Sequence, residues 1–342
     1  MDQNQTQQLN IKEAPGIQQQ FFALLKNSMP PHVSMADELS EKMGLSYDSI
    51  YRRIRGEKAL SMLELKMLCQ QYNISLDQVL DIQNTTVVFN APDINTNSQP
   101  FQDYLKGLVD RFKHINSCTH KKMRYLCKDM TLWQFFLFPE LTAFKLFFWI
   151  KTIQNDTAFN KAKFCFEKYG FNEIFAICQQ LVREYNQIPS TELWSIECTN
   201  STIKQIEYYR DAGLFENRKE MILIIDSFWC TIDHIQLQAE KGFKFMPGDT
   251  EVRYKAPQQF YINEVILGNN TMMIESDEIK ETWATYNVLN YMITKDPRYS
   301  KQAFASFDNL VSRSTLISNA SEKERNRFFN IVKERINLLK AG

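Results

Sequence analysis

The stretch SMADELSEKMGLSYDSIYRRIRGEKALSMLELKML, residues Ser34 to Leu68, follows the pattern helix, tight turn, helix, loop, helix. Ser34 is placed to cap the N-terminus of the first helix, because its hydroxyl can accept a bond from a free backbone N–H. Gly44 stands where that helix must end, since glycine adopts the left-handed backbone conformation without a Cβ clash. Ser46 is placed to cap a second helix that runs through Arg55. The stretch therefore predicts two short helices joined at a glycine corner.

The second helix has an apolar face. Its apolar residues recur at intervals of three and four, which is the spacing of one side of an α-helix; they are Tyr47, Ile50, Tyr51 and Ile54. Further core positions are expected at Leu60, Leu63, Leu65 and Leu68. The pattern predicts that the second helix packs on its neighbours through this face.

This order of residues resembles the helix-turn-helix head of phage-repressor-like (XRE) regulators, over roughly residues 17 to 82. The residues that carry the resemblance are Leu39, the small Ser40, Gly44, Leu45, Ser46, Ile50 and Arg55-Gly56, with the tail CQQYNISLDQVL from Cys69 to Leu80. It implies a five-helix DNA-binding domain at residues 16–82, with a recognition helix at 46–55 in the major groove. Arg53 departs from the family, which usually has an apolar residue there. Either the helix is rotated slightly, or Tyr51 and Ile54 carry the packing.

Seven residues are expected to contact DNA: Tyr47, Asp48, Ser49, Arg52, Arg53, Arg55 and Lys58. Arg52 is the expected base reader, because it lies opposite the apolar face and arginine can bond two acceptors of guanine. The resemblance adds Tyr47 and Asp48 as base-reading positions. Arg53, Arg55 and Lys58 are expected at phosphates. The alternative is a solvated charged face on an ordinary bundle helix.

Charge balance limits the classes of function. The 342-residue chain has 40 Lys plus Arg and 40 Asp plus Glu, so any nucleic-acid binding must come from a local basic patch. The 25 Phe and 14 Tyr, with only 10 Gly and 10 Pro, favour helices. Seven scattered cysteines without a CxxC pair suggest reduced thiols and a cytoplasmic protein. The N-terminal residues do not resemble a signal peptide, and polar residues interrupt the apolar run 132–150, so no membrane span is expected.

The remainder of the chain is expected to be mainly helical. Residues 1–15 are predicted to be a disordered tail, and 83–100 a polar linker. The domain at 101–342 is predicted to contain a small antiparallel sheet with a β-hairpin near 259–276. Gly268-Asn269-Asn270 supply the turn of this hairpin, because Gly and Asn tolerate positive φ. A third strand is expected near 281–286.

Two other clusters are candidates for a site. His114, Cys118, His120 and Cys127 are ligand types for zinc, but their spacing matches no zinc motif, so no metal is expected. An aromatic cluster could line a pocket, although helical spacing more often marks core; it comprises Trp133, Phe135, Phe136, Phe138, Phe144, Phe147, Phe148 and Trp149. The chain has no GxSxG, HExxH, GxxxxGK[ST] or GxGxxG motif. We therefore expect neither catalysis nor a cofactor.

Together these features predict a sequence-specific transcriptional regulator that binds double-stranded DNA. The large domain is expected to form a homodimer, to sense a small-molecule or peptide effector, or both. The rival from another class is a non-catalytic interaction protein whose helix-turn-helix head docks a protein partner. A third possibility is an enzyme with an unrecognised helical active site.

Overall fold

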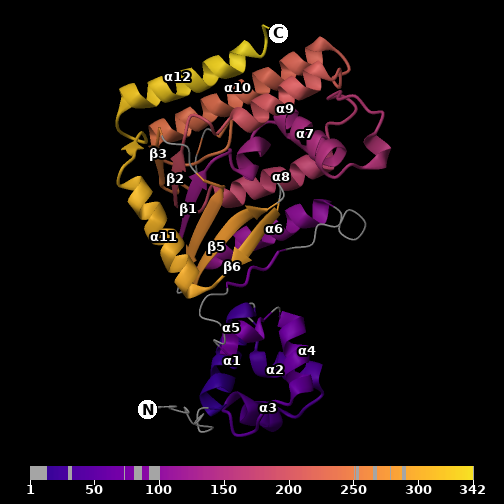
Figure 1. Ribbon diagram of the computed structural model, residues 1–342, viewed down its shortest axis with the longest axis vertical. Helices are drawn as coiled ribbons and strands as arrows, with labels where there is room; N and C mark the ends of the chain where they lie inside the picture. Colours follow the sequence, from indigo (N-terminus) through magenta and orange to yellow (C-terminus); the bar gives the residue numbers. More distant parts are fainter. Residues whose placement is uncertain are drawn as a thin grey trace, which may run out of the picture. The chain divides into compact units, whose positions relative to one another are not determined.

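The chain divides into two compact units, Met1–Asn90 and Ala91–Gly342 (Figure 1). The structure is a computed structural model, and it describes residues 14–29, 33–72, 74–80, 87–91, 101–249, 251, 254–264, 268–277, 279–286 and 290–341. The predicted tail 1–15 lies outside the described residues except for residues 14 and 15, which belong to the first helix. The predicted linker 83–100 also lies outside them, except for residues 87–91.

The first unit, which we call the head, consists of short helices around a small apolar core. The helices are α1 (Ala14–Ser28), α2 (Met35–Met43), α3 (Tyr47–Ile54), α4 (Met62–Tyr72) and α5 (Leu76–Leu80). Four of them contribute fully buried side chains to the centre: Phe21 and Leu25 from α1, Leu39 from α2, Ile50 from α3 and Leu68 from α4. This core fixes which side of α3 faces inward.

The larger unit combines helices with one sheet. Its α-helices are α6 (Phe101–Ser117), α7 (Pro139–Phe148), α8 (Asn172–Tyr185), α9 (Asn200–Asp211), α10 (Arg218–Lys241), α11 (Pro297–Val311) and α12 (Glu322–Leu338). Shorter helices are the 3₁₀ segments η2 (Leu132–Phe136) and η4 (Thr157–Phe159) and the π segment η3 (Trp149–Ile153). The strands are β1 (Lys121–Cys127), β2 (Ser190–Trp194), β3 (Gln258–Ile262), β4 (Thr271–Ser276), β5 (Ile279–Tyr286), β6 (Asn290–Thr294) and β7 (Thr315–Leu316).

The sheet is larger than predicted and mixed, so the expected small antiparallel sheet is wrong. Its strand order is β6-β5-β4-β1-β2-β3-β7. The central strands β1, β2 and β3 are parallel, and the remaining neighbours pair antiparallel. Strands β1 and β2 escaped prediction because β1 begins with two lysines and β2 (STELW) has only two apolar residues, yet every residue of β2 is buried.

The hairpin predicted near 259–276 is also wrong. Strand β3 pairs with β2 and β7, whereas β4 pairs with β1 and β5, so β3 and β4 are not neighbours. Instead, β4 pairs with the next strand, β5, with Asp277 at a positive φ of 48° between them, and β5 in turn pairs antiparallel with β6. Turn chemistry at 268–270 was therefore a poor guide, because pairing with the distant strand β2 decides where β3 lies.

Different elements pack on the two faces of the sheet. Helix α11 covers one face, where Leu193 and Met273 of the sheet meet Phe304 and Phe307 (Figure 1). The other face carries the main core, which includes the fully buried Trp133 and nearly all of the aromatic cluster. The apolar run 132–150 thus folds into η2, α7 and the start of η3 inside this core. No helix among the described residues combines the length and the apolar character that a bilayer span requires.

Candidate nucleic-acid interface

Helices α2 and α3 meet at the corner that the sequence predicted. The Ser34 hydroxyl accepts a bond from the backbone N–H of Asp37 at the start of α2. Gly44 ends α2 at φ +62°, and its N–H donates to the carbonyl of Ser40. The Ser46 hydroxyl then accepts from the N–H of Ser49. The two predicted helix starts and the glycine stop are confirmed.

The inward face of α3 differs from the expected apolar face. Ile50 is 1% exposed, and Arg53 is only 4% exposed. Tyr47 and Tyr51, which were expected to point inward, are 53% and 47% exposed. The structure has neither of the two alternatives left by the sequence: Tyr51 is exposed, and Arg53 itself occupies the inward position that the XRE family fills with an apolar residue.

Arg53 is stabilised there by polar partners. Its Nη2 lies 2.7 Å from Oε1 of Glu64, and its Nη1 donates to the carbonyl and the hydroxyl of Ser49 at 3.1 and 3.2 Å. These contacts neutralise the buried cation and bond both of its Nη atoms, whereas its Nε has no hydrogen-bond partner among the described residues. Arg53, expected at a phosphate, therefore joins α3 to α4, and Ser49 is turned toward it.

Glu64 also caps the helix that carries it. Its Oε2 accepts from the N–H of Ser61 at 2.7 Å, and the Ser61 hydroxyl accepts from the N–H of Glu64 at 3.2 Å. This reciprocal pair is a capping box at the start of α4. Burial alone would raise the pKa of Glu64, but the bonds from Ser61 and Arg53 outweigh it and hold the pKa below 4.5. One carboxylate thus serves both α3 and α4.

The outward side of the same region carries the remaining cations. The side chains of Arg52 and Arg55 are 52% and 53% exposed, and Lys58 is exposed in the following loop. Glu57 lies between the two arginines: its Oε1 is 2.6 Å from Nε of Arg55, and its Oε2 is 3.8 Å from Nε of Arg52. The hydrogen bond from Arg55 lowers the pKa of Glu57. Two arginines thus converge on one solvent-exposed carboxylate, as they would on a phosphate.

The loop after α3 is fixed by α1. The amide nitrogen of Gln18 donates to the carbonyls of Arg53 and Lys58 at 2.6 and 2.8 Å, and its oxygen accepts from the N–H of Leu60 at 2.9 Å. Gln19 donates to the carbonyl of Arg55 at 3.0 Å. Sequence reasoning missed both glutamines, because an amide side chain in a Gln-rich run has no pattern that identifies its backbone partners. They hold the segment that presents Arg55 and Lys58.

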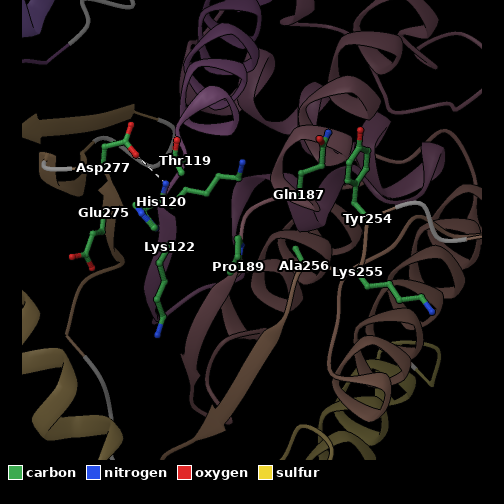
Figure 2. A pocket seen from close by; sticks show the side chains of 11 residues that line it. Thr119, His120, Lys122, Gln187, Pro189, Tyr254, Lys255, Ala256, Glu275 and Asp277 are labelled. Carbon is green, nitrogen blue, oxygen red and sulfur yellow. Dashed lines mark hydrogen bonds between the residues drawn. The ribbon is translucent and has the colours of Figure 1, made fainter.

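The larger unit has an open cleft of about 760 Å³ at the amino ends of β1 and β2 (Figure 2). The backbone N–H of His120 donates to Asp277 at 2.9 Å on one side. Glu275 and Lys255 lie on opposite sides of the cleft and point away from each other (Figure 2). Glu275 is also bound to Arg124 at 3.2 Å. The polar groups around this cleft therefore do not converge on a common point.

The four zinc-type residues do not come together. His114 is in α6, Cys118 follows that helix, and His120 precedes β1. Cys127 is buried at the opposite end of β1. Within the part of the chain that the structure describes, no three His, Cys, Asp or Glu side chains form a group that could hold a metal ion.

The strongest candidate site is therefore the outward surface around α3, formed by Tyr47, Asp48, Tyr51, Arg52, Arg55 and Lys58. Tyr51 is the member that the sequence had assigned to the inward face. In comparisons with known proteins, no family model, no curated protein and no solved structure matches this chain.

Proposed function

We propose that the protein is a sequence-specific DNA-binding transcriptional regulator whose helix α3 enters the major groove. The observation that carries this proposal is the division of the arginines on and just after α3. Arg53 is bound inward by Glu64, whereas Arg52 and Arg55 are exposed and share one carboxylate. An α-helix fits the major groove of B-DNA, so a supported helix with outward arginines suits it.

The roles of individual residues follow from their exposure. We assign base reading to Arg52, because it lies on α3 itself and arginine can bond O6 and N7 of guanine together. Arg55 and Lys58 lie after the helix and are assigned to phosphates, with a phosphate replacing Glu57. Tyr47, Asp48 and Tyr51 complete the surface. Arg53 is assigned a positioning role, since its guanidinium has no access to DNA.

We also propose that the protein acts in the cytoplasm as a homodimer on an inverted repeat, without catalysis of its own. One small head reads a short site, and two linked heads multiply selectivity without new contacts. The C-terminal helix is a poor candidate for the dimer contact. Phe328 and Phe329 of α12 are 6% and 0% exposed, and Phe329 packs 5.9 Å from the ring of Phe260 in β3.

Selection of bound sequences from random double-stranded DNA tests this proposal. We expect the full-length protein to enrich one motif with two-fold symmetry. Its affinity for that motif should fall steeply with salt, because phosphate contacts release counterions. A folded protein that enriches no motif would contradict the proposal. An asymmetric motif bound by one protein chain would retain the DNA-binding function and contradict the dimer.

A specific observation favours the rival, a head that docks a protein. Met62 and Leu63, at the start of α4, are 78% and 77% exposed, although Leu63 was expected in the core. Exposed apolar residues of this kind can mark an interaction surface. The variant Met62→Ser with Leu63→Ser should leave DNA affinity unchanged under the main proposal, whereas Arg52→Ala should reduce it. Under the rival, the selection experiment enriches nothing with any of these proteins.

A further inference from the structure

The backbone that follows α3 brings a carboxylate into the candidate interface. Gly56 has a φ of +79°, a left-handed conformation that glycine adopts without strain. The N–H of Gly56 donates to the carbonyl of Arg53 at 2.9 Å, and the N–H of Glu57 donates to the carbonyl of Arg52 at 2.8 Å. These two bonds form a Schellman motif, in which the residue that makes the second bond commonly packs its side chain on the last turn of the helix. The backbone therefore places Glu57 beside Arg52.

The side-chain contact at this helix end is ionic, whereas the contact that usually accompanies a Schellman motif is apolar. Glu57 accepts two parallel bonds from Arg55, from Nε to Oε1 at 2.6 Å and from Nη2 to Oε2 at 3.0 Å. The same Oε2 lies 3.8 Å from Nε of Arg52, which is too far for a hydrogen bond. Arg55 is therefore the main partner of Glu57, and Arg52 is attracted to it by charge alone.

The stability of α3 does not explain a carboxylate at this position. The C-terminus of a helix carries partial negative charge, so it favours cations and disfavours anions. The side chains of Glu57 and Arg55 are 48% and 53% exposed, and ion pairs as exposed as this contribute little to folding. The buried pair of Arg53 and Glu64 already joins α3 to α4. The position of Glu57 therefore indicates a role at the surface itself.

Helix α1 fixes the backbone on both sides of Glu57. Gln18 donates to the carbonyls of Arg53 and Lys58, and Gln19 donates to the carbonyl of Arg55. The backbone of this segment therefore stays in place when a ligand approaches. The half-exposed side chain of Glu57 is free to rotate into solvent, and that rotation releases both of the exposed arginines.

We propose that Glu57 is an internal competitor of the DNA backbone, which lowers the affinity of the head for every DNA sequence; this inference rests on the proposed function. Its carboxylate bonds Arg55 in the bidentate manner of a phosphate. DNA must break these bonds, and the displaced carboxylate stays near the phosphates, whose charge repels it. Because phosphate contacts are common to all sequences, Glu57 opposes them all. Each head alone then binds weakly, which increases the dependence on two linked heads.

Binding of random double-stranded DNA by full-length Glu57→Gln protein tests the proposal. Glutamine keeps the size of the side chain and can still accept a bond from Arg55, but it has no charge to repel a phosphate. We expect Glu57→Gln to bind random DNA about three- to tenfold more tightly than wild type at about 0.1 M salt. The gain should shrink as salt is added, because salt screens exposed charges. The selected motif should gain at least as much as random DNA.

Glu38→Gln is a matched control, because it makes the same change of charge elsewhere in the head and also removes an ion pair. Oε1 of Glu38 lies 2.7 Å from Nζ of Lys42 and accepts from the hydroxyl of Tyr72, the last residue of α4. Glu64, the partner of Arg53, is in the first turn of α4, about 12 Å from Tyr72 along the helix axis. Glu38→Gln should therefore change DNA affinity by less than about twofold. A gain as large as that of Glu57→Gln would show an effect of net charge alone and would overturn the proposal.

A double-mutant comparison tests whether Glu57 acts through Arg55. In Arg55→Ala protein the main partner of Glu57 is absent, so adding Glu57→Gln should tighten binding of random DNA by about twofold or less. The same gain in the two backgrounds would overturn the proposed competition for Arg55.

The outcomes distinguish this inference from the proposed function. If wild-type protein binds DNA and Glu57→Gln binds it no more tightly, the inference is overturned and the proposed function stands. If neither wild type nor any of these variants binds DNA, the proposed function is contradicted, and the inference is overturned with it.

Discussion

The head and the larger unit both bury an ionisable side chain, but they surround it differently. In the head, Arg53 pairs with a single carboxylate, Glu64, eleven residues further along the chain. In the larger unit, Glu192 is 0% exposed at the centre of β2. Five side chains from α8, β2, β3 and η2 donate to its carboxylate: Tyr185, Ser190, Trp194, Gln258 and Gln134.

The Arg53–Glu64 ion pair is local to two helices, whereas the hydrogen bonds to Glu192 come from several separate elements. The Arg53 pair links two helices that adjoin in sequence, so its loss should loosen α3 and α4 only. The hydrogen bonds around Glu192 join β2 to the neighbouring strand β3 and to the helical segments η2 and α8. Loss of Glu192 leaves several buried donors without an acceptor at once, and each carries its own desolvation cost.

The largest effect is expected for Glu192→Ala. The substitution leaves five buried hydrogen-bond donors without their acceptor. The larger unit should therefore lose about 3–5 kcal/mol of its free energy of unfolding or fail to fold. Urea denaturation of the full-length protein measures this. Glu240→Ala, at an exposed position of α10, is the matched control and should stay within about 0.5 kcal/mol of wild type. A Glu192→Ala protein as stable as this control would show that these hydrogen bonds contribute nothing.

A smaller loss is expected for Arg53→Ala. It removes a hydrogen-bonded ion pair, but Glu64 is 21% exposed and keeps its bond from Ser61, so the head should lose about 1–3 kcal/mol. The measurement is thermal unfolding of the full-length protein, followed by circular dichroism. The transition of the larger unit should not move. A shift of both transitions would mean that the pair is not local.

Arg52→Ala tests the exposed arginine that adjoins the buried Arg53. It should leave head stability unchanged and lower affinity for the selected DNA by about 1–3 kcal/mol, with little change on random DNA. Lys58→Ala should instead weaken all sequences alike and flatten the salt slope by about one unit. Binding titrations on both DNAs at several salt concentrations distinguish these outcomes. An equal loss on both DNAs for Arg52→Ala would move it to the phosphate contacts.

The smallest effect is expected for the stability of the head at acidic pH. The folded-state pKa of Glu64 is held below 4.5, its value in the unfolded chain. A lowered folded pKa contributes stability that is complete above the unfolded pKa and is lost as pH falls through the folded pKa. Head stability should therefore decline below about pH 4.5, and the decline should be shallower in Arg53→Ala. Melting curves at a series of acidic pH values test this. Identical pH profiles for the two proteins would exclude Arg53 as a source of the shift.

Local signals in the sequence predicted the head better than the sheet. Ser34, Gly44 and Ser46 each act on backbone groups a few residues away, so sequence alone placed the ends of α2 and the start of α3. Strands β2 and β3 pair across a separation of 68 residues, as Ser190 opposite Gln258, and no local pattern encodes that partnership.

The site, like the fold, was predictable only where local spacing decides the position of a residue. Helical spacing put Arg52 on the outer side of α3, but the inward turn of Arg53 depends on Glu64 in another helix. In the sequence, Lys145 is only one of the polar residues that interrupt the apolar run 132–150. Its partners Thr202 and Gln205 lie more than fifty residues away, and only the fold brings them to it.

The strand order also bears on how the chain folds during its synthesis. The contacts of the head join residues that lie close in sequence, so they can form while the ribosome is still making the rest of the chain. Strand β1 pairs with β2 and later with β4, and β2 must wait for β3. At about 5–20 residues per second, the β1–β2 pair spends several seconds without its remaining neighbours. Long-range pairing of this kind folds slowly and exposes unpaired edges. The larger unit is therefore the part of the chain most in need of protection from aggregation while it is being made.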